Sequence, residues 1–162
     1  MKAAPPASPA RSPRTKARSK PEAYVAEPPA QYLARPRIVI DCSVLGAFLF
    51  NESTAEVARQ LIFGRDLHAP WLLDHEIANV ASKKQRGGTP DEAVEAAITR
   101  YLDFDVSLHR TAPDVVLPLA ATYALSGYDA AYLALAAELR VPLITFDSRL
   151  GKAAMRHLPS LP

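Results

Sequence analysis

Short apolar runs alternate with amphipathic helical stretches along most of the chain. Ile38–Ile40 is a short β-branched run, which is typical of a strand buried in a parallel sheet. Val141–Phe146 has the same character, and Val106–His109 predicts a further strand. Leu67–Ala69 is apolar but too short to assign. The first predicted strand places the start of the fold at Arg37.

Helical periodicity and capping signals fill the intervals between these strands. The predicted helices are Val44–Phe50, a helix from Ser53 or Thr54 to about Phe63, a helix through Glu76 that ends near Arg86, Pro90–Leu102, Pro113–Leu125, Asp129–Leu139 and Arg149–Arg156. Ser43 is expected to cap the first helix, and Thr89 the fourth, with Glu92 closing a capping box. Strands that alternate with helices predict an α/β domain, with a mostly parallel sheet and helices on both faces.

Composition and charge divide the chain near residue 36. Residues 1–36 hold eight of the 15 prolines and seven Lys/Arg against two Glu, a net charge of +5, while the rest carries −3. The formal +2 of the 162-residue chain therefore adds two unlike parts. We expect a basic, Pro-rich extension without a fold over 1–36, a folded domain over 37–158 and a short tail over 159–162. The start of the extension also resembles an organellar transit peptide in composition.

Cysteine content and hydropathy exclude several classes of protein. The single cysteine, Cys42, excludes an internal disulfide and a thiolate-cluster metal site, and it fits a reducing compartment, so we expect a cytoplasmic protein. No stretch approaches the ~18 uninterrupted apolar residues of a membrane span. The glycines form neither a dinucleotide-binding fingerprint nor a phosphate-binding loop.

Four acidic residues stand where a parallel sheet builds its ligand site. Asp41 and Asp147 each follow a predicted strand, and Glu76 and Asp129 lie near predicted helix starts. Ligands of open parallel sheets bind at the carboxyl ends of the strands, so we expect the four to converge. Close carboxylates repel unless a cation neutralises them, and Mg²⁺ or Mn²⁺ prefers such oxygen ligands. An ion there suits phosphodiester hydrolysis.

Each of these acids also has a purely structural interpretation. Asp41 or Asp147 can cap the helix that follows it, and Asp129 can favour a helix N-terminus. Glu76 can be an ordinary solvated glutamate. Their shared placement favours the functional interpretation.

The segments around these acids resemble the successive motifs of PIN domains. The four motifs are Ile-Asp41-Cys-Ser43-Val-Leu, Leu-Asp-His-Glu76-Ile-Ala-Asn-Val, Ser-Gly-Tyr-Asp129-Ala-Ala-Tyr-Leu-Ala-Leu-Ala and Leu-Ile-Thr145-Phe-Asp147-Ser-Arg-Leu. The resemblance covers about Arg37 to Ala154 and is closest to VapC-type ribonuclease toxins. It implies a PIN-like three-layer fold. It also implies a Mg²⁺- or Mn²⁺-dependent endoribonuclease, with Asp41, Glu76, Asp129 and Asp147 as catalytic metal ligands.

The resemblance further implies supporting residues and partners. Ser43 would support Asp41 or touch substrate, and Thr145 would hydrogen-bond the carboxylate of Asp147. A cognate antitoxin protein and a homodimer follow from the family alone. Such toxins usually begin almost at the first strand, which leaves the role of residues 1–36 open, including a translation start later than Met1.

An RNA substrate needs basic residues near the acids. Lys83 follows Glu76 on its helix, and Arg149, Lys152 and Arg156 share one helix face, so Lys83, Arg149 and Lys152 are candidate phosphate contacts. A solvated helix face is the alternative. Two other functions stay open: a non-catalytic RNA- or partner-binding module, and an aspartyl-phosphate phosphatase. The second lacks its Asp-x-Asp pattern, because position 43 is serine.

Overall fold

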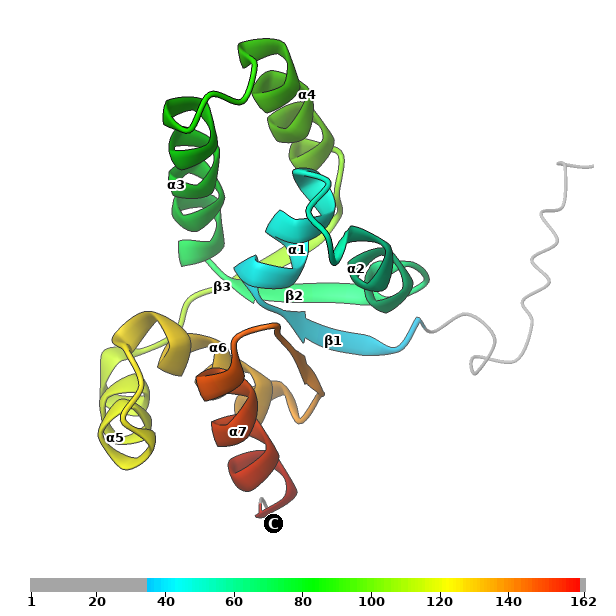
Figure 1. The fold of residues 1–162 in the computed structure, drawn as a ribbon. Coiled ribbons are helices and arrows are strands. Elements are labelled where there is room, and N and C mark those ends of the chain that lie inside the picture. Colours follow the sequence, from blue (N-terminus) through cyan, green and yellow to red (C-terminus); the bar gives the residue numbers. More distant parts are fainter. Residues whose placement is uncertain (1–34, 161–162) are drawn as a thin grey trace, which may run out of the picture. The chain divides into compact units, whose positions relative to one another are not determined.

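A four-stranded parallel sheet forms the centre of the fold (Figure 1). The computed structural model describes residues 35–160, so most of the predicted extension and the last two residues of the predicted tail lie outside the described part. The strand order is β3-β2-β1-β4, and every neighbouring pair is parallel. The strands are β1 (Arg37–Ile40), β2 (Asp66–Pro70), β3 (Val106–His109) and β4 (Leu143–Ile144).

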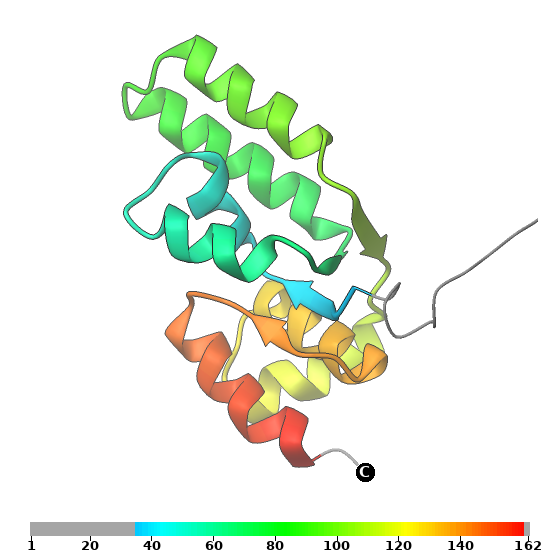
Figure 2. The same ribbon diagram turned by 90° about the vertical axis from the view of Figure 1, so that its right-hand side faces the viewer.

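The seven α-helices of the described part cover the two faces of this sheet, so that helices, sheet and helices form three layers (Figures 1 and 2). The helices α1 to α4 lie on one side, with α1 packed against α2 and α3 against α4, and α5 to α7 lie on the other, with α6 against the strands. They are α1 (Cys42–Leu49), α2 (Ala55–Ile62), α3 (Leu72–Arg86), α4 (Asp91–Leu102), α5 (Pro113–Tyr123), α6 (Gly127–Leu139) and α7 (Ser148–His157), followed by the 3₁₀ turn Leu158–Ser160. The predicted α/β three-layer class is confirmed. None of these helices is long and apolar enough to cross a membrane.

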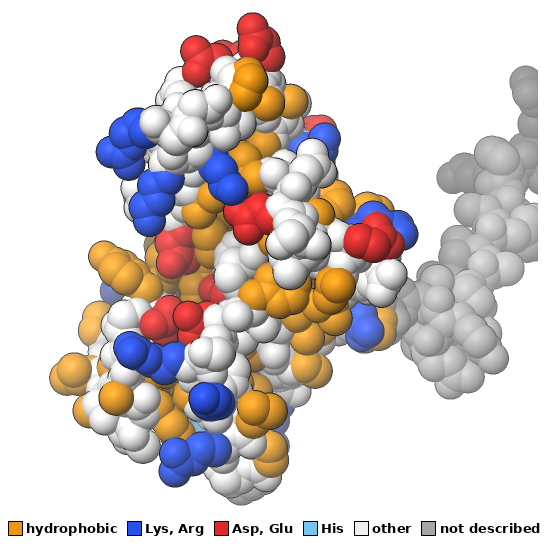
Figure 3. Space-filling view, in the orientation of Figure 1, with side chains coloured by type: hydrophobic (Ala, Val, Ile, Leu, Met, Phe, Trp, Pro, Cys, Tyr) orange, Lys and Arg blue, Asp and Glu red, His pale blue; other side chains and the backbone are white. Residues whose placement is uncertain are grey.

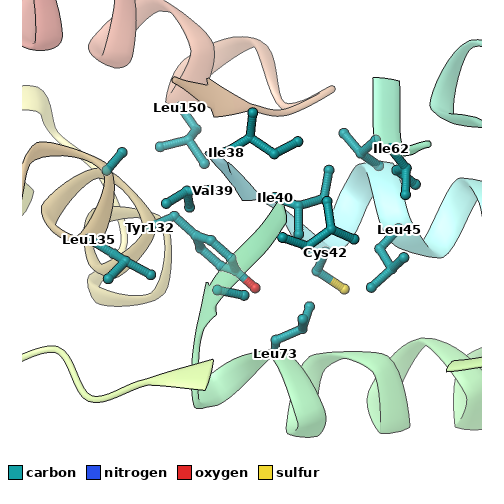
Figure 4. Close-up of a cluster of buried hydrophobic side chains, with 14 of the residues drawn as sticks. Ile38, Val39, Ile40, Cys42, Leu45, Ile62, Leu73, Tyr132, Leu135 and Leu150 are labelled. Atoms are coloured by element: carbon teal, nitrogen blue, oxygen red, sulfur yellow. The ribbon is translucent and has the colours of Figure 1, made fainter. Parts of the chain in front are cut away.

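The core forms where α1 and α6 press on opposite sides of β1 (Figure 4). Ile38, Val39 and Ile40 are buried completely or nearly so, which explains their β-branched run. In α6, seven consecutive residues from Ala130 to Ala136 are buried, so this helix is apolar on all sides. Its many alanines let the helix backbone approach the sheet closely.

Two strands differ from the sequence prediction. Asp66–Pro70 forms β2, which pairs with both β1 and β3, so hydrogen bonds on both sides stabilise a segment with few strand-forming residues. By contrast, β4 contains only Leu143 and Ile144 of the predicted run Val141–Phe146. It lies at the sheet edge and follows Pro142, which has no backbone N–H to donate.

Helix caps account for the other differences. Asp41, not Ser43, is the N-cap of α1, and its carboxylate accepts the Ser43 N–H. Pro90 is the N-cap of α4, without a side-chain cap bond, so the predicted Thr89 capping box is absent at this position. α5 ends two residues early, because Ala124 adopts a left-handed conformation with φ of 53°.

Candidate active site

The candidate site lies where the chain reverses its direction across the sheet. From β1 the chain adds β2 and then β3 on one side, and returns to place β4 on the other side of β1. Helices from the two neighbouring strands therefore diverge at the carboxyl ends of β1 and β4. Ligands of open α/β sheets bind at this kind of switch point. Asp41 follows β1 there, and Thr145 follows β4.

Asp41 is held by two hydroxyl groups from different parts of the chain. Thr145 Oγ1 donates to Asp41 Oδ2 over 2.8 Å, and the Ser43 hydroxyl donates to the same oxygen. Only 6% of Asp41 is exposed. Burial raises the pKa of Asp41 above its usual value, and the hydrogen bonds from Ser43 and Thr145 oppose this rise. The structure thus places the Ser43 hydroxyl on Asp41, which is the contact that the first of its two expected roles needs.

Glu76 is positioned by Tyr132, a tyrosine of α6. The hydroxyl of Tyr132 donates to Glu76 Oε2, while its ring lies in the buried cluster of Figure 4. Burial, followed by the charges of Asp41 and Asp129, raises the pKa of Glu76. The charges of Asp41 and Asp129 therefore both reach Glu76. The spacing of Asp129 and Tyr132, one turn apart on α6, is the sequence signal that connects this tyrosine with the site.

Asp129 belongs to a reciprocal cap at the start of α6. Its N–H donates to Ser126 Oγ over 3.1 Å, and Ser126 Oγ donates back to Asp129 Oδ2 over 2.8 Å. This serine was missed by the sequence interpretation, although Ser-x-x-Asp is a capping-box pattern. The cap fixes the carboxylate at a helix N-terminus, where the helix dipole favours negative charge.

Asp147 is the N-cap of α7, and it is exposed. Its Oδ1 accepts the N–H groups of Arg149 and Leu150, both over 2.8 Å. The expected bond from Thr145 to the Asp147 carboxylate is wrong: the Thr145 hydroxyl is turned to Asp41 on the neighbouring strand and accepts the Asp147 N–H instead. Asp147 thus connects with the other acids through Thr145.

The donor chemistry fits a hard cation, although the carboxylates do not form a closed cage. Residues 35–160 contain no group of three or more His, Cys, Asp or Glu side chains already arranged to hold a metal ion. Asp41, Glu76 and Asp129 nevertheless share one electrostatic environment and offer only oxygen. Mg²⁺ keeps several waters and binds through one or two carboxylates and substrate phosphates, which such an open arrangement allows.

A cavity of about 270 Å³ opens beside these acids. Glu76 and Lys83 of α3 line it together with Cys42 and Tyr128. Burial and the charges of Glu76 and Asp41 raise the pKa of the Cys42 thiol to about 12, so this thiol stays protonated and is not a nucleophile. Of the predicted basic contacts, the structure places Lys83 at the cavity, whereas Arg149 and Lys152 are exposed on α7.

The charge pattern around the site is visible on the surface (Figure 3). Acidic side chains gather in a hollow in the middle of this face, and Lys and Arg side chains lie above and below them. Arg156, which shares the α7 face with Arg149, lies 5.9 Å from the ring centre of Tyr123 and has a structural contact there.

Comparisons with known proteins agree with this architecture. A model of the PIN domain family matches residues 38–155. The chain is 35% identical over 131 residues to ribonuclease VapC9 of Mycobacterium tuberculosis, covering 75% of this chain and 94% of that protein. It is 29% identical over 122 residues to ribonuclease VapC3 of Pyrobaculum aerophilum, covering 72% and 93%. The chain therefore belongs to the PIN domain family and to its VapC-type ribonucleases.

Solved structures support the fold independently. PAE2754 from Pyrobaculum aerophilum superposes with a TM-score of 0.59 at 23% identity, covering 78% of this chain and 90% of that chain. VapC20 of Mycobacterium tuberculosis, described as a sarcin-ricin loop cleaving toxin, superposes with a TM-score of 0.54 at 17% identity, covering 72% and 94%. At these identities the likeness concerns the fold.

Proposed function

We propose that the protein is a metal-dependent endoribonuclease that acts as the toxin of a toxin–antitoxin pair. The observation that carries the proposal is the gathering of Asp41, Glu76 and Asp129 at the sheet's switch point, where the charges of Asp41 and Asp129 both act on Glu76. Carboxylates gathered in this way favour a bound cation, because the cation offsets their repulsion. The names of the VapC relatives supply the substrate class, RNA.

The four acids would hold Mg²⁺ or Mn²⁺. Asp41, Glu76 and Asp129 offer their carboxylates directly, and Asp147 offers Oδ2, because its cap bonds use Oδ1. An ion held there would supply activation of a water molecule and stabilisation of negative charge on the phosphate.

The remaining residues of the site keep these acids in place and bind substrate. Ser43 and Thr145 fix the orientation of Asp41, and Tyr132 fixes that of Glu76. Burial removes water around Asp41, which strengthens its interaction with a cation. Lys83 is proposed to bind an RNA phosphate at the cavity, and Arg149 and Lys152 to bind others from α7.

The decisive experiment is RNA cleavage by the purified chain with Mg²⁺, with Mn²⁺ and with EDTA. We expect metal-dependent cleavage that is lost in Asp129→Asn and Asp41→Asn while circular dichroism shows a folded protein. Asp114→Asn is the matched control, because Asp114 also lies in the first turn of a helix but outside the site. Full cleavage by folded Asp129→Asn would overturn the proposal.

The biological role has its own test. We propose that the toxin acts in the cytoplasm as a homodimer restrained by an antitoxin protein. Expression of the full chain is expected to arrest growth, while the Asp129→Asn chain allows growth. RNA binding without any metal-dependent cleavage would favour the alternative, a non-catalytic PIN-like binding module.

A further inference from the structure

The cavity beside the acids has two unlike walls. One face of α3 forms the first wall, with side chains at positions 72, 75, 76, 79, 80 and 83, which follow the helical repeat. Leu72 and Val80 are apolar, whereas Asn79 and Lys83 are polar and exposed. Tyr128, near the start of α6, contributes to the opposite wall. This combination of an aromatic ring, apolar side chains and a few polar groups is typical of sites for flat organic ligands.

Tyr128 has no structural task that accounts for its position. Its side chain is 67% exposed, in contrast to Tyr132 on the same helix, of which 1% is exposed. Within residues 35–160 its hydroxyl makes no hydrogen bond, whereas those of Tyr101, Tyr123 and Tyr132 each do. It directly precedes Asp129, so a group in contact with its ring lies next to the acidic site.

We propose that this cavity binds one unpaired nucleobase of the RNA beside the bond that is cut. The base stacks on the ring of Tyr128, and the Asn79 amide, which has both a donor and an acceptor, hydrogen-bonds to the edge of the base. Lys83 binds the phosphate of a neighbouring nucleotide. This inference rests on the proposed function and assigns a base contact to the same site.

The size of the cavity and its charges support an unpaired base. At about 270 Å³ the cavity is slightly smaller than usual ligand pockets. This volume suits a single base rather than a base-paired duplex. Bases inside a duplex expose no face for stacking, so proteins that read RNA bases select loops and ends. Lys83 and Glu76 line the same cavity, so Lys83 provides positive charge beside a carboxylate of the site.

The test measures binding in EDTA, where cleavage is stopped. The probe is a short single-stranded oligoribonucleotide with randomised sequence around a central 2-aminopurine, a base whose fluorescence falls when it stacks on an aromatic ring. We expect quenching by the wild type and by Tyr128→Phe. In Tyr128→Ala, quenching is lost and the dissociation constant rises roughly 5- to 150-fold, the range given by stacking of one base. An RNA duplex carrying the same base is expected to show no dependence on Tyr128.

The matched control is Phe63→Ala, which removes an aromatic side chain of similar exposure, 57%, outside the cavity. It is expected to bind like the wild type. Equal binding and quenching by Tyr128→Ala and wild type would overturn the inference, while metal-dependent cleavage would still support the proposed function. Binding and quenching that depend on Tyr128 in a protein without cleavage would support base binding in the cavity and overturn the proposed function.

Discussion

Thr145 Oγ1 donates a hydrogen bond to Asp41 Oδ2 over 2.8 Å, although 104 residues separate the two in sequence. The bond joins the carboxyl ends of β4 and β1, which are neighbours in the sheet. Thr145 also accepts the N–H of Asp147, so one hydroxyl holds the most buried acid and the start of α7. The geometry of the candidate site therefore depends on this threonine.

Replacing Thr145 by valine tests that dependence. Thr145→Val keeps the shape but leaves Asp41 Oδ2 and the Asp147 N–H with one partner fewer, so we expect a loss of about 1–3 kcal/mol in the free energy of unfolding. Cleavage is expected to fall about 10- to 100-fold, as for other residues that orient metal ligands. Urea denaturation and cleavage rates measure the two effects. Thr145→Ser, which retains the hydroxyl, should preserve most activity. Wild-type cleavage by Thr145→Val would contradict the role.

Glu76→Gln tests the cost of charge at the site. The pKa of Glu76 is raised in the fold, so the folded state disfavours the charged form, and wild-type stability falls as pH rises through that raised pKa. Glutamine avoids this loss and still accepts the Tyr132 hydrogen bond. The comparison is made in EDTA. At about pH 4 we expect the wild type and Glu76→Gln to have equal melting temperatures, and at about pH 8 we expect Glu76→Gln to have the higher one.

The control for that series is Glu95→Gln, on the exposed face of α4. Its melting temperature should differ from the wild type by little at any pH in the range. A difference between Glu76→Gln and wild type that does not change with pH would contradict the electrostatic explanation.

Two substitutions of Asp147 separate its cap from its charge. Asn is a good N-cap, so Asp147→Asn should keep stability within about 0.5 kcal/mol while it reduces metal-dependent cleavage. Asp147→Ala removes the acceptor of the Arg149 and Leu150 N–H groups and should cost a further ~1 kcal/mol. Thermal unfolding and cleavage assays measure both. Full cleavage by Asp147→Asn would contradict a role of Asp147 in metal binding and would show that this residue is only a helix cap.

Gly46→Ala is expected to stabilise the protein. Gly46 lies within α1, and a Cβ atom there would meet only Val80 Cγ1 at 3.9 Å, an ordinary contact. Alanine should therefore raise the free energy of unfolding by roughly 0.5–1 kcal/mol. Gly64→Ala is the contrasting variant: φ at Gly64 is +73°, so alanine should destabilise despite open space around it. A destabilised Gly46→Ala would indicate closer packing of α1 on α3.

Much of the fold follows from local sequence signals. The β-branched run of β1, the alternation of β3, the helical periodicity of α3 and the continuous apolar run of α6 are strong local signals, and the structure has these elements close to the predicted bounds. Local signals did not predict β2, because its stability comes from pairing with strands on both sides. The expected caps Ser43 and Thr89 were wrong, whereas the alternative that Asp41 caps the helix after β1 was right. Asp and Ser side chains near a helix start compete for the same N–H groups, so the pattern alone does not choose between them.

For the site, the sequence by itself determined which residue types are present: carboxylates after strands and at helix starts, and hydroxyl groups near them. Only the tertiary structure decided which of them meet. Parallel pairing of β1 with β4 brings Thr145 to Asp41, and burial of α6 brings Tyr132 to Glu76. The physical reason is that these contacts join distant segments, whose proximity depends on strand order and helix packing rather than on any local pattern.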